Sequence, residues 1–298
     1  MTVSAIPACR ICGARARLLV SREVSEAPES AVYRCGGCDL VYLDPIMSEA
    51  EEAAFYLDEF ERYMEGRSGP GWKSPEAHFQ SYQSEAMRRW PLVEPYVQPT
   101  DRVLEVGSST GFFLDRLTRH VATVTGVEPS EAYRLYANSR RIETVDNVAA
   151  LGSRQFDVIL LYYVLEHLRD PIGYLRRLGE WLAPSGRLLI EVPNVEDALL
   201  SVYAVPSFGP FYWQKAHYQN FSHRTLGAIL GQAGYAAELV PVQRYDLSNH
   251  MVWMLEGRPG GFGRYRHLLS ADVDAAYAEA LKRQWVCDTI YAVARRPA

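Results

Sequence analysis

One stretch, from Arg102 to Leu114, constrains the fold more than any other part of the 298-residue chain; it reads R-V-L-E-V-G-S-S-T-G-F-F-L. The residues up to Val106 form a short apolar run typical of a buried strand, a glycine-containing turn follows, and apolar residues then recur at helical spacing. The stretch therefore predicts a strand, a tight loop and the start of a helix. Such units build open α/β sheets, which bind ligands outside the carboxyl ends of their strands.

The loop does not match the two common phosphate-binding loops. In the register of a dinucleotide loop, the three glycine positions hold Gly107, Ser109 and Phe112. The ring of Phe112 stands where close packing of helix on strand requires the absence of a side chain. A P-loop ends in Gly-Lys-Ser/Thr, whereas Gly111 is followed by two phenylalanines. The sequence therefore disfavours NAD, FAD and ATP as ligands.

Two acidic residues indicate the ligand that remains. Glu105 lies inside the strand before the loop, and Glu128 ends the next apolar run, about twenty residues on, where a carboxylate can accept both ribose hydroxyls. We expect the backbone N–H groups of the loop and the positive end of the helix dipole to face the same ligand. Carboxylates in place of phosphate-binding cations favour a nucleoside without phosphates and with a positively charged end, which describes S-adenosylmethionine.

Four segments, in order, resemble motifs of the class I S-adenosylmethionine-dependent methyltransferases. They are V-L-E-V-G-S-S-T-G, V-E-P-S, F-D-V-I-L-L-Y-Y-V-L-E-H-L-R-D-P and L-L-I-E-V-P-N, and the resemblance runs from Arg102 to Tyr235, with Ser109 where many members have glycine. It implies an α/β fold with a seven-stranded, mostly parallel, doubly wound (Rossmann-like) sheet. It also implies a cofactor site formed by Glu105, Gly107, Ser108, Ser109, Gly111, Phe112, Glu128, Pro129, Asp146, Asn147, Val148, Tyr162 and Tyr82.

The resemblance gives some of these residues specific expected roles. A helix before the first strand closes over the cofactor in the family, which makes Phe79 and Tyr82 candidates for that contact; a stripe of core residues is the alternative. Residues Asp146, Asn147 and Val148 flank the adenine by resemblance, although Asp146 also suits a solvated turn. Tyr162 and Tyr163 end the fourth strand, below the methionine part of the cofactor.

Four of the five cysteines stand in two Cys-x-x-Cys pairs, and they are Cys9, Cys12, Cys35 and Cys38. This spacing lets two thiolates from one turn reach a tetrahedral zinc ion, and two pairs complete the site. Because four sulfurs leave no open position, the predicted Zn²⁺ is structural; reduced cysteines without metal are the alternative. The segment resembles the zinc-binding module that precedes certain sugar methyltransferases, whose large C-terminal domain this chain is too short to contain.

The predicted domain organisation has three parts. They are a zinc ribbon over residues 1–45, a helical linker and cofactor lid over 46–96, and a methyltransferase domain over 97–298 with a substrate-covering insertion at about 243–285. Further elements are expected at Glu49–Glu61 and Glu76–Trp90 (helices), Phe156–Tyr163 and Gly186–Val192 (strands), a helix after Ser222, a strand through Val242 and a last strand at Thr289–Arg295.

The acceptor side of the predicted site centres on His217. The segment A-H-Y-Q-N-F-S resembles E-H-L-x-x-F-S of the zinc-module methyltransferases, whose Glu-His pair sits at the substrate; Ala216 replaces the glutamate here. We expect His217 to act as the base on a hydroxyl, oriented by Tyr218 or Tyr163, with His250 in reserve. The aromatic stretch 207–221 suits either a pocket wall or a loop packed on the sheet.

These features predict O-methylation of a small-molecule acceptor, with a sugar as the first choice. N- or C-methylation of a non-sugar natural product and a non-catalytic protein with the same fold are the alternatives. A net charge of −5 provides no basic field, so neither a nucleic acid nor a membrane is an expected partner. No apolar run approaches membrane-spanning length and no leader is recognised, which predicts a cytoplasmic protein. The sequence leaves the oligomeric state open.

Overall fold

The structure is a computed structural model, and it describes residues 8–297. Residues 1–7, on which the expected absence of a leader depends, lie outside the described residues. The chain divides into two compact units, each made of separate stretches of sequence. The first unit comprises Met1–Ile46, Leu165–Leu175 and Glu191–Ala292, and the second comprises Met47–Val164, Arg176–Ile190 and Val293–Ala298.

The second unit contains four strands in the order β7-β4-β5-β6, and they are β4 (Arg102–Val106), β5 (Thr123–Val127), β6 (Glu143–Val145) and β7 (Phe156–Tyr162). The pairs β4–β5, β4–β7 and β5–β6 are all parallel. Their apolar side chains are buried, as the continuous apolar runs of parallel strands require. Parallel pairing brings the loops after β4 and β5 to one edge of the sheet, where the cofactor site was predicted.

Helical segments surround these strands within the second unit. They are α1 (Glu49–Ala54), η1 (Phe55–Glu59), α2 (Phe60–Ser68), η2 (Pro70–Trp72), α3 (Pro75–Ser81), α4 (Gln83–Val93), η3 (Glu94–Tyr96), α5 (Phe112–Leu117), α6 (Glu131–Ser139) and η4 (Val148–Leu151). Ser48 begins α1 with a capping box, in which it exchanges hydrogen bonds with Glu51. The expected helix Glu76–Trp90 is two helices, because Tyr82 departs from helical geometry (ψ 5°).

The first unit contains a four-stranded antiparallel sheet in the order β1-β2-β3-β9. Its strands are β1 (Arg17–Ser21), β2 (Ala31–Cys35), β3 (Val41–Asp44) and β9 (Gln219–Asn220). An ion pair of 2.6 Å between Arg17 and Asp44 joins its outer and inner strands. The two-residue strand β9 lies far along the chain from the ribbon, so the ribbon sheet is completed by the segment that carries His217.

The other elements of the first unit are η5 (Leu165–His167), α8 (Ala198–Ser201), α9 (Phe208–Tyr212), α10 (His223–Gln232), β10 (Ala236–Val242), α11 (Leu247–Glu256) and α12 (Ala271–Arg283). Ser222 caps α10, as predicted. The insertion expected at about 243–285 holds α11 and α12. Three elements contain residues of both units: α7 (Pro171–Leu178), β8 (Leu182–Pro193) and β11 (Thr289–Arg295), and β8 begins earlier than the expected Gly186.

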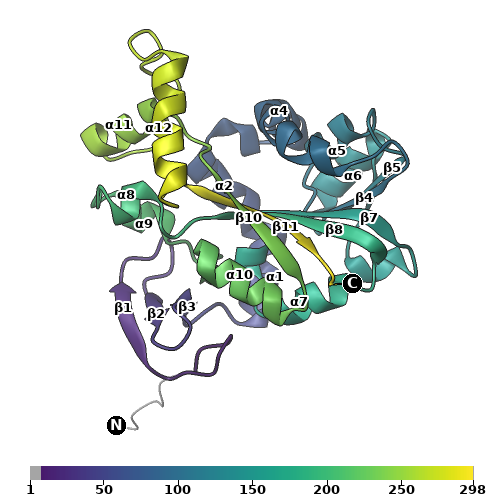
Figure 1. Cartoon of the computed structure of the whole chain (residues 1–298), viewed down its shortest axis with the longest axis horizontal. Helices are drawn as coiled ribbons and strands as arrows, with labels where there is room; N and C mark the ends of the chain where they lie inside the picture. The colour runs from purple at the N-terminus through teal and green to yellow at the C-terminus, as the bar shows by residue number, and fades with distance from the viewer. Residues whose placement is uncertain (1–7, 298) are drawn as a thin grey trace. The chain divides into compact units, whose positions relative to one another are not determined.

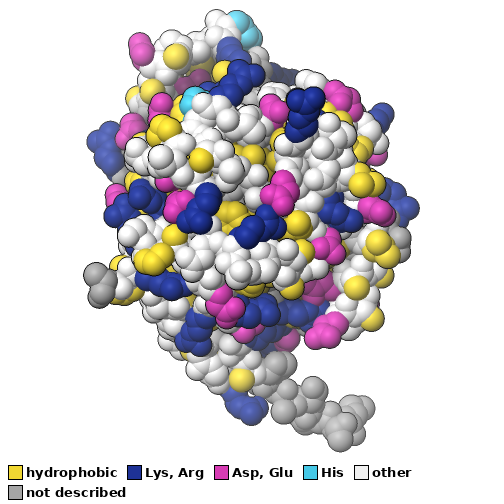
Figure 2. Space-filling view, turned by 90° about the vertical axis from the view of Figure 1, so that its right-hand side faces the viewer, with side chains coloured by type: hydrophobic (Ala, Val, Ile, Leu, Met, Phe, Trp, Pro, Cys, Tyr) yellow, Lys and Arg dark blue, Asp and Glu magenta, His cyan; other side chains and the backbone are white. Residues whose placement is uncertain are grey.

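Seven strands pair in the order β10-β11-β8-β7-β4-β5-β6 (Figure 1). This order confirms the predicted α/β, Rossmann-like sheet. On the face shown in Figure 2, acidic and basic side chains are interspersed, with hydrophobic side chains between them. Among residues 8–297, no helix combines the length and the apolar character needed to cross a bilayer.

Candidate functional site

The loop after β4 has the backbone conformation that its glycines predict. Gly107 and Gly111 have φ of 72° and 71°, and Ser109 adopts a φ of 52° between them. The N–H groups of Gly107 and Ser108 donate to the carbonyl of Val127, at 2.8 and 3.0 Å. We expected the N–H groups of the loop to face a ligand. For Gly107 and Ser108 this expectation is wrong, because their N–H groups form hydrogen bonds with the end of β5.

Replacing Gly107 with alanine is expected to destabilise the protein by about 1–3 kcal/mol. A Cβ there would lie 2.7 Å from Cγ2 of Val164, at a φ that side chains disfavour. Gly231→Ala in α10 is the matched control, because its Cβ meets open space, and it should be neutral or stabilising by up to about 1 kcal/mol. Urea unfolding measures both, and equal stabilities would contradict the assigned backbone strain.

Glu128 stands at the end of β5 with its carboxylate turned to the loop. Oε2 accepts from the N–H of Ser109 and Oε1 accepts from the N–H of Ser130, both at 2.8 Å. Burial raises the pKa of Glu128 to about 7, although these two backbone hydrogen bonds lower it. Each carboxylate oxygen retains lone pairs for another donor, so the residue is able to accept the hydroxyls of a ribose. Pro129, predicted beside it, is exposed.

Glu105 is a buried carboxylate whose charge is incompletely balanced. Its side chain is 2% exposed, and Oε2 has no hydrogen-bond partner among the described residues. Burial raises the pKa of Glu105 to about 8; the guanidinium of Arg89 opposes this shift, and Glu128 adds to it. A positively charged ligand group at this point would stabilise the ionised form. The orphaned oxygen therefore fits a cationic nucleoside such as S-adenosylmethionine, and Glu105 and Glu128 are the residues that would hold it.

His78 and Arg89 belong to this region and were not predicted. The ring of His78 lies 2.9 Å from Oγ1 of Thr110 (Nδ1) and 3.3 Å from Oγ of Ser109 (Nε2), and burial lowers its pKa to about 3. Arg89 lies 4.5 Å from the ring centre of Tyr162. The sequence contains a signal that could have indicated them. His78 and Arg89 lie four residues before and seven residues after the predicted lid residue Tyr82, which is helical spacing.

The two predicted lid residues have different surroundings. Tyr82 stacks on His78 with ring centres 4.2 Å apart and packs against Phe112 at 5.2 Å, so it lies beside the glycine loop. Phe79 instead packs on α6, with the guanidinium of Arg140 4.0 Å from its ring centre. The structure therefore brings Tyr82 to the loop and gives Phe79 the alternative role of a core residue.

Other predicted cofactor residues lie at the ends of β6 and β7. Asp146 is exposed, and Oδ1 of Asn147 accepts from the N–H groups of Ala149 and Ala150, which makes Asn147 the cap of η4 before Val148. Tyr162 is buried against Phe113, with ring centres 5.6 Å apart. Tyr163 has a φ of 56°, so the chain turns sharply at the carboxyl end of β7. Ser108 is buried in the loop itself.

In the first unit, His217 lies next to a second histidine. Its ring and that of His167 are perpendicular, with centres 4.8 Å apart, and Glu166 is buried beside them. Burial lowers the pKa of His167 to about 4, although a hydrogen bond to the backbone of Ala216 raises it. Tyr218 is also buried, and the guanidinium of Arg169 lies 5.5 Å from its ring centre.

His250 belongs to a separate polar network. Nδ1 lies 2.7 Å from the hydroxyl of Tyr277, Nε2 lies 3.3 Å from the amide nitrogen of Gln243, and burial lowers the pKa of His250 to about 4. That amide in turn donates to Asp288 at 2.8 Å. The hydrogen bonds of His250 thus connect α11 with α12 and with the ends of β10 and β11. This pattern is typical of a histidine with a structural role.

The aromatic stretch 207–221 is compact. Phe208 and Phe211 each pack against Trp253, with ring centres 4.9 Å apart, and Tyr212 packs against Trp213 at 5.0 Å. Most of these side chains are buried. Close mutual packing favours the alternative of a packed segment over the expected pocket wall.

The four predicted metal ligands converge in the ribbon. Sγ of Cys9 lies 3.8 Å from Sγ of Cys38, and Sγ of Cys12 lies 3.5 Å from Sγ of Cys35. A tetrahedral site with Zn–S bonds of about 2.3 Å places its sulfurs about 3.8 Å apart. Burial raises the pKa of Cys35, but hydrogen bonds with Cys38 and Gly37 bring it to about 7. Burial also raises the pKa of Cys9 and that of Cys38, so the fit rests on the sulfur geometry. The donor set therefore fits a structural zinc ion.

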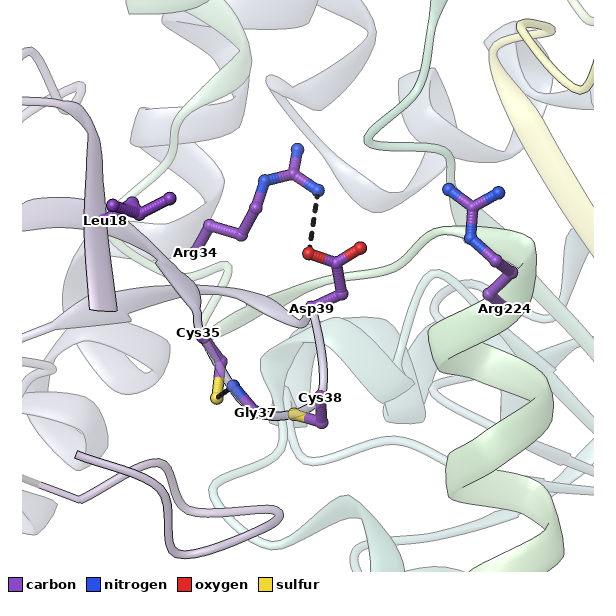
Figure 3. A pocket seen from close by; sticks show the side chains of 8 residues that line it. Leu18, Arg34, Cys35, Gly37, Cys38, Asp39 and Arg224 are labelled. Atoms are coloured by element: carbon purple, nitrogen blue, oxygen red, sulfur yellow. Dashed lines mark hydrogen bonds and ion pairs between the residues drawn. The ribbon is translucent and has the colours of Figure 1, made fainter. Parts of the chain in front are cut away.

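A cavity of about 580 Å³ lies beside the second cysteine pair (Figure 3). It is lined by Leu18, Arg34, Cys35, Gly36, Gly37, Cys38, Asp39 and Arg224. Arg34 points to Asp39, 3.5 Å away, and Arg224 is 2.5 Å from Glu196. Because both cations are paired, this cavity offers little unbalanced charge to an anion, and no predicted acceptor residue lines it.

Comparisons with known proteins give relatives for part of the chain. Two curated relatives, each named ubiquinone biosynthesis O-methyltransferase, come from Citrobacter koseri and Aeromonas salmonicida; they are 32% and 31% identical over 103 residues. Each match covers 31% of this chain and 43% of the relative, so the chain spans less than half the length of these curated relatives.

One solved structure and one family model match a larger part of the chain than these relatives do. A SAM-dependent methyltransferase from Archaeoglobus fulgidus has a TM-score of 0.53 and 17% identity, over 80% of this chain and 100% of that one, which shows a shared fold. Residues 79–240, more than half of the chain, match the family described as "Methyltransferase domain". The chain therefore belongs to the methyltransferase domain family, and its fold is that of the class I S-adenosylmethionine-dependent methyltransferases.

Proposed function

We propose that this protein transfers the methyl group of S-adenosylmethionine to a hydroxyl oxygen of a small molecule, with a sugar as the first choice of acceptor. The observation that carries the proposal is the pair of carboxylates beside the glycine loop: Glu128 for the ribose and Glu105 for the positively charged end. The name of the curated relatives favours oxygen over nitrogen or carbon as the acceptor atom. The sugar rests on the resemblance of the N-terminal ribbon and the A-H-Y-Q-N-F-S segment.

When bound, the cofactor supplies a methyl group that is carried on a sulfonium. The sulfur leaves as a neutral thioether when an acceptor oxygen attacks the methyl carbon in line. The C–O bond forms as the S–C bond breaks, and the hydroxyl proton must move to a base. We assign that proton to the imidazole of His217, with Tyr218 as the residue that orients the acceptor. The other task of the chain is to hold the acceptor in a water-excluding position, which contributes most of the rate.

A non-catalytic role for the same fold is the rival from another class. An interaction platform has no use for Glu105, because a buried carboxylate with an unsatisfied oxygen costs stability unless a ligand balances it. A structural zinc ion in the ribbon is compatible with either reading, since four thiolates leave no position for a substrate.

Glu128→Gln is expected to weaken S-adenosylmethionine binding by about 2–4 kcal/mol, or roughly 30- to 1,000-fold. The amide loses the charge that strengthens hydrogen bonds from two ribose hydroxyls. Glu131→Gln, an exposed acid in the first turn of α6, is the matched control and should bind normally. Isothermal titration calorimetry measures both, and equal affinities would remove Glu128 from the cofactor site.

The pH dependence of wild-type binding is the accompanying control. Because the pKa of Glu128 is raised to about 7, the residue is largely protonated at pH 6 and ionised at pH 8. Affinity should therefore fall as the pH falls, by roughly tenfold between pH 8 and pH 6. The same titration with Glu128→Gln should show a smaller change, since the titrating group is gone.

A further inference from the structure

The group formed by Glu166, His167 and His217 lies in the first unit, apart from the cysteines. Each residue offers one ligand atom, a carboxylate oxygen or an imidazole nitrogen, and the three atoms lie within 4.8 Å of one another. They come from η5 and from the turn before β9, and these two elements pack together. Two segments some fifty residues apart thus place three potential metal ligands at one point.

The carboxylate of Glu166 is the strongest sign that something is bound here. Its side chain is 1% exposed, and neither oxygen has a hydrogen-bond partner among the described residues. Nε2 of His167 lies 4.0 Å from Oε1 of Glu166, which is beyond hydrogen-bonding distance. A carboxylate buried without partners is expensive, and coordination of a metal ion is one of the few arrangements that stabilises it.

The surroundings of Glu166 contain further buried polar groups. The buried carboxylate of Glu191 is an electrostatic neighbour of Glu166. Gln219 on β9 is 1% exposed, and neither its amide oxygen nor its amide nitrogen has a partner among the described residues. Glu166 therefore has an acidic neighbour, and the buried amide of Gln219 adds polar atoms that have no partner among the described residues.

The histidines are arranged as metal ligands commonly are. A hydrogen bond between the His167 ring and the backbone of Ala216 fixes the orientation of the ring, as such bonds do for histidines that bind metals. The side chain of His167 is 19% exposed while that of Glu166 is 1%, so the group is open to solvent on one side. Metal–ligand bonds of about 2.1 Å place ligands roughly 3–3.5 Å apart, which requires side-chain movements of only about 1 Å.

We infer that Glu166, His167 and His217 form a second metal site, specific for a divalent first-row transition cation such as Mn²⁺ or Zn²⁺. Two imidazoles and one carboxylate suit these ions, and three protein ligands leave coordination positions open for water or an acceptor oxygen. This differs from the ribbon, where four thiolates close the site. One consequence rests on the proposed function: a cation held here would lower the pKa of the acceptor hydroxyl, so that its proton could leave to solvent water, and His217 would be a ligand instead of the base assigned above.

Manganese titration followed by electron paramagnetic resonance tests the site directly. Mn²⁺ prefers oxygen and nitrogen to thiolate, so the protein is first loaded with a single equivalent of zinc per chain, which fills the thiolate ribbon and leaves the second site for Mn²⁺. The wild-type chain should bind one Mn²⁺, and both Glu166→Gln and His217→Asn should weaken that binding at least 100-fold. His223→Asn is the matched control, because its histidine pairs with Glu196 at 3.3 Å outside the group, and it should bind Mn²⁺ as the wild type does.

The inference is overturned if Mn²⁺ binds the wild type and both variants equally, because Glu166 and His217 would then not be ligands of the bound ion. Circular dichroism checks that the variants fold. If Glu166→Gln does not fold, His217→Asn still tests the site. Calorimetry with S-adenosylmethionine on the same samples separates the two proposals. Normal cofactor binding without Mn²⁺ binding refutes only the metal site, whereas Mn²⁺ binding with no cofactor binding refutes only the proposed function.

Discussion

Serine in place of Cys35 is expected to empty the ribbon site and to unfold β1–β3 locally. Cys35 is 1% exposed and its sulfur lies 3.5 Å from that of Cys12, so it is a central ligand of the group. Structural zinc contributes about 10–16 kcal/mol to the folding of isolated zinc-finger peptides, so its loss is a large destabilisation even though Val32, Leu40 and Leu43 are also buried. Zinc content should fall by one ion per chain, and amide exchange in β2 and β3 should accelerate strongly.

Cys287→Ser provides the matched control for this change. Cys287 is buried, at 0% exposure, but it lies outside the group of four cysteines. Its replacement is expected to leave zinc content unchanged, whatever small loss of packing it causes. If Cys35→Ser contained as much zinc as the wild type, or if purified wild-type protein contained none under conditions that preserve thiolate sites, the assignment of a structural zinc ribbon would be wrong.

The second large effect concerns His217. Replacement with asparagine, which keeps a polar side chain but removes the basic nitrogen, is expected to lower kcat by roughly 10²–10⁴-fold. The affinity for S-adenosylmethionine should not change, because the proposed cofactor contacts lie on other residues. Single-turnover transfer of a labelled methyl group gives the rate, and calorimetry gives the affinity, so the two parts of the expectation are measured separately.

His223→Asn again serves as the control and should retain the wild-type rate. An unchanged kcat in His217→Asn would remove this residue from the reaction. A loss of kcat that excess Mn²⁺ partly restores would indicate that His217 acts as a metal ligand, whereas a loss that Mn²⁺ does not alter would indicate that it takes the proton itself. His250 is a poor substitute base, since its hydrogen bonds serve the contacts between α11 and α12.

Most of the fold was predictable because its strands and loops carry strong local signals. The apolar runs before Gly107 and Glu128 became β4 and β5, and the last strand has the predicted bounds Thr289–Arg295. Short elements were not predictable in this way. The strand β9 contains two residues, and no pattern of that length indicates that it pairs with β3 of the ribbon.

The candidate site was predictable where residues follow motifs and was missed where helices supply them. Glu105 and Glu128 were predicted from their places in the apolar runs. Glu105 interrupts the first run, and Glu128 ends the next one at the distance where a carboxylate can accept ribose hydroxyls. His78 was missed because a histidine within an aromatic helical face looks like a core residue, and only the fold reveals its contacts with Ser109 and Thr110. The sequence indicates no binding role for Glu166, because the lack of partners for its oxygens depends on burial, which composition does not report.

A crystal structure of the protein with S-adenosylhomocysteine tests the central claim most directly. The account predicts the ribose hydroxyls on the carboxylate of Glu128, and the amino end of the ligand on the side of Glu105. Density for the ligand at another place, or an empty loop region after soaking at millimolar concentration, would contradict it.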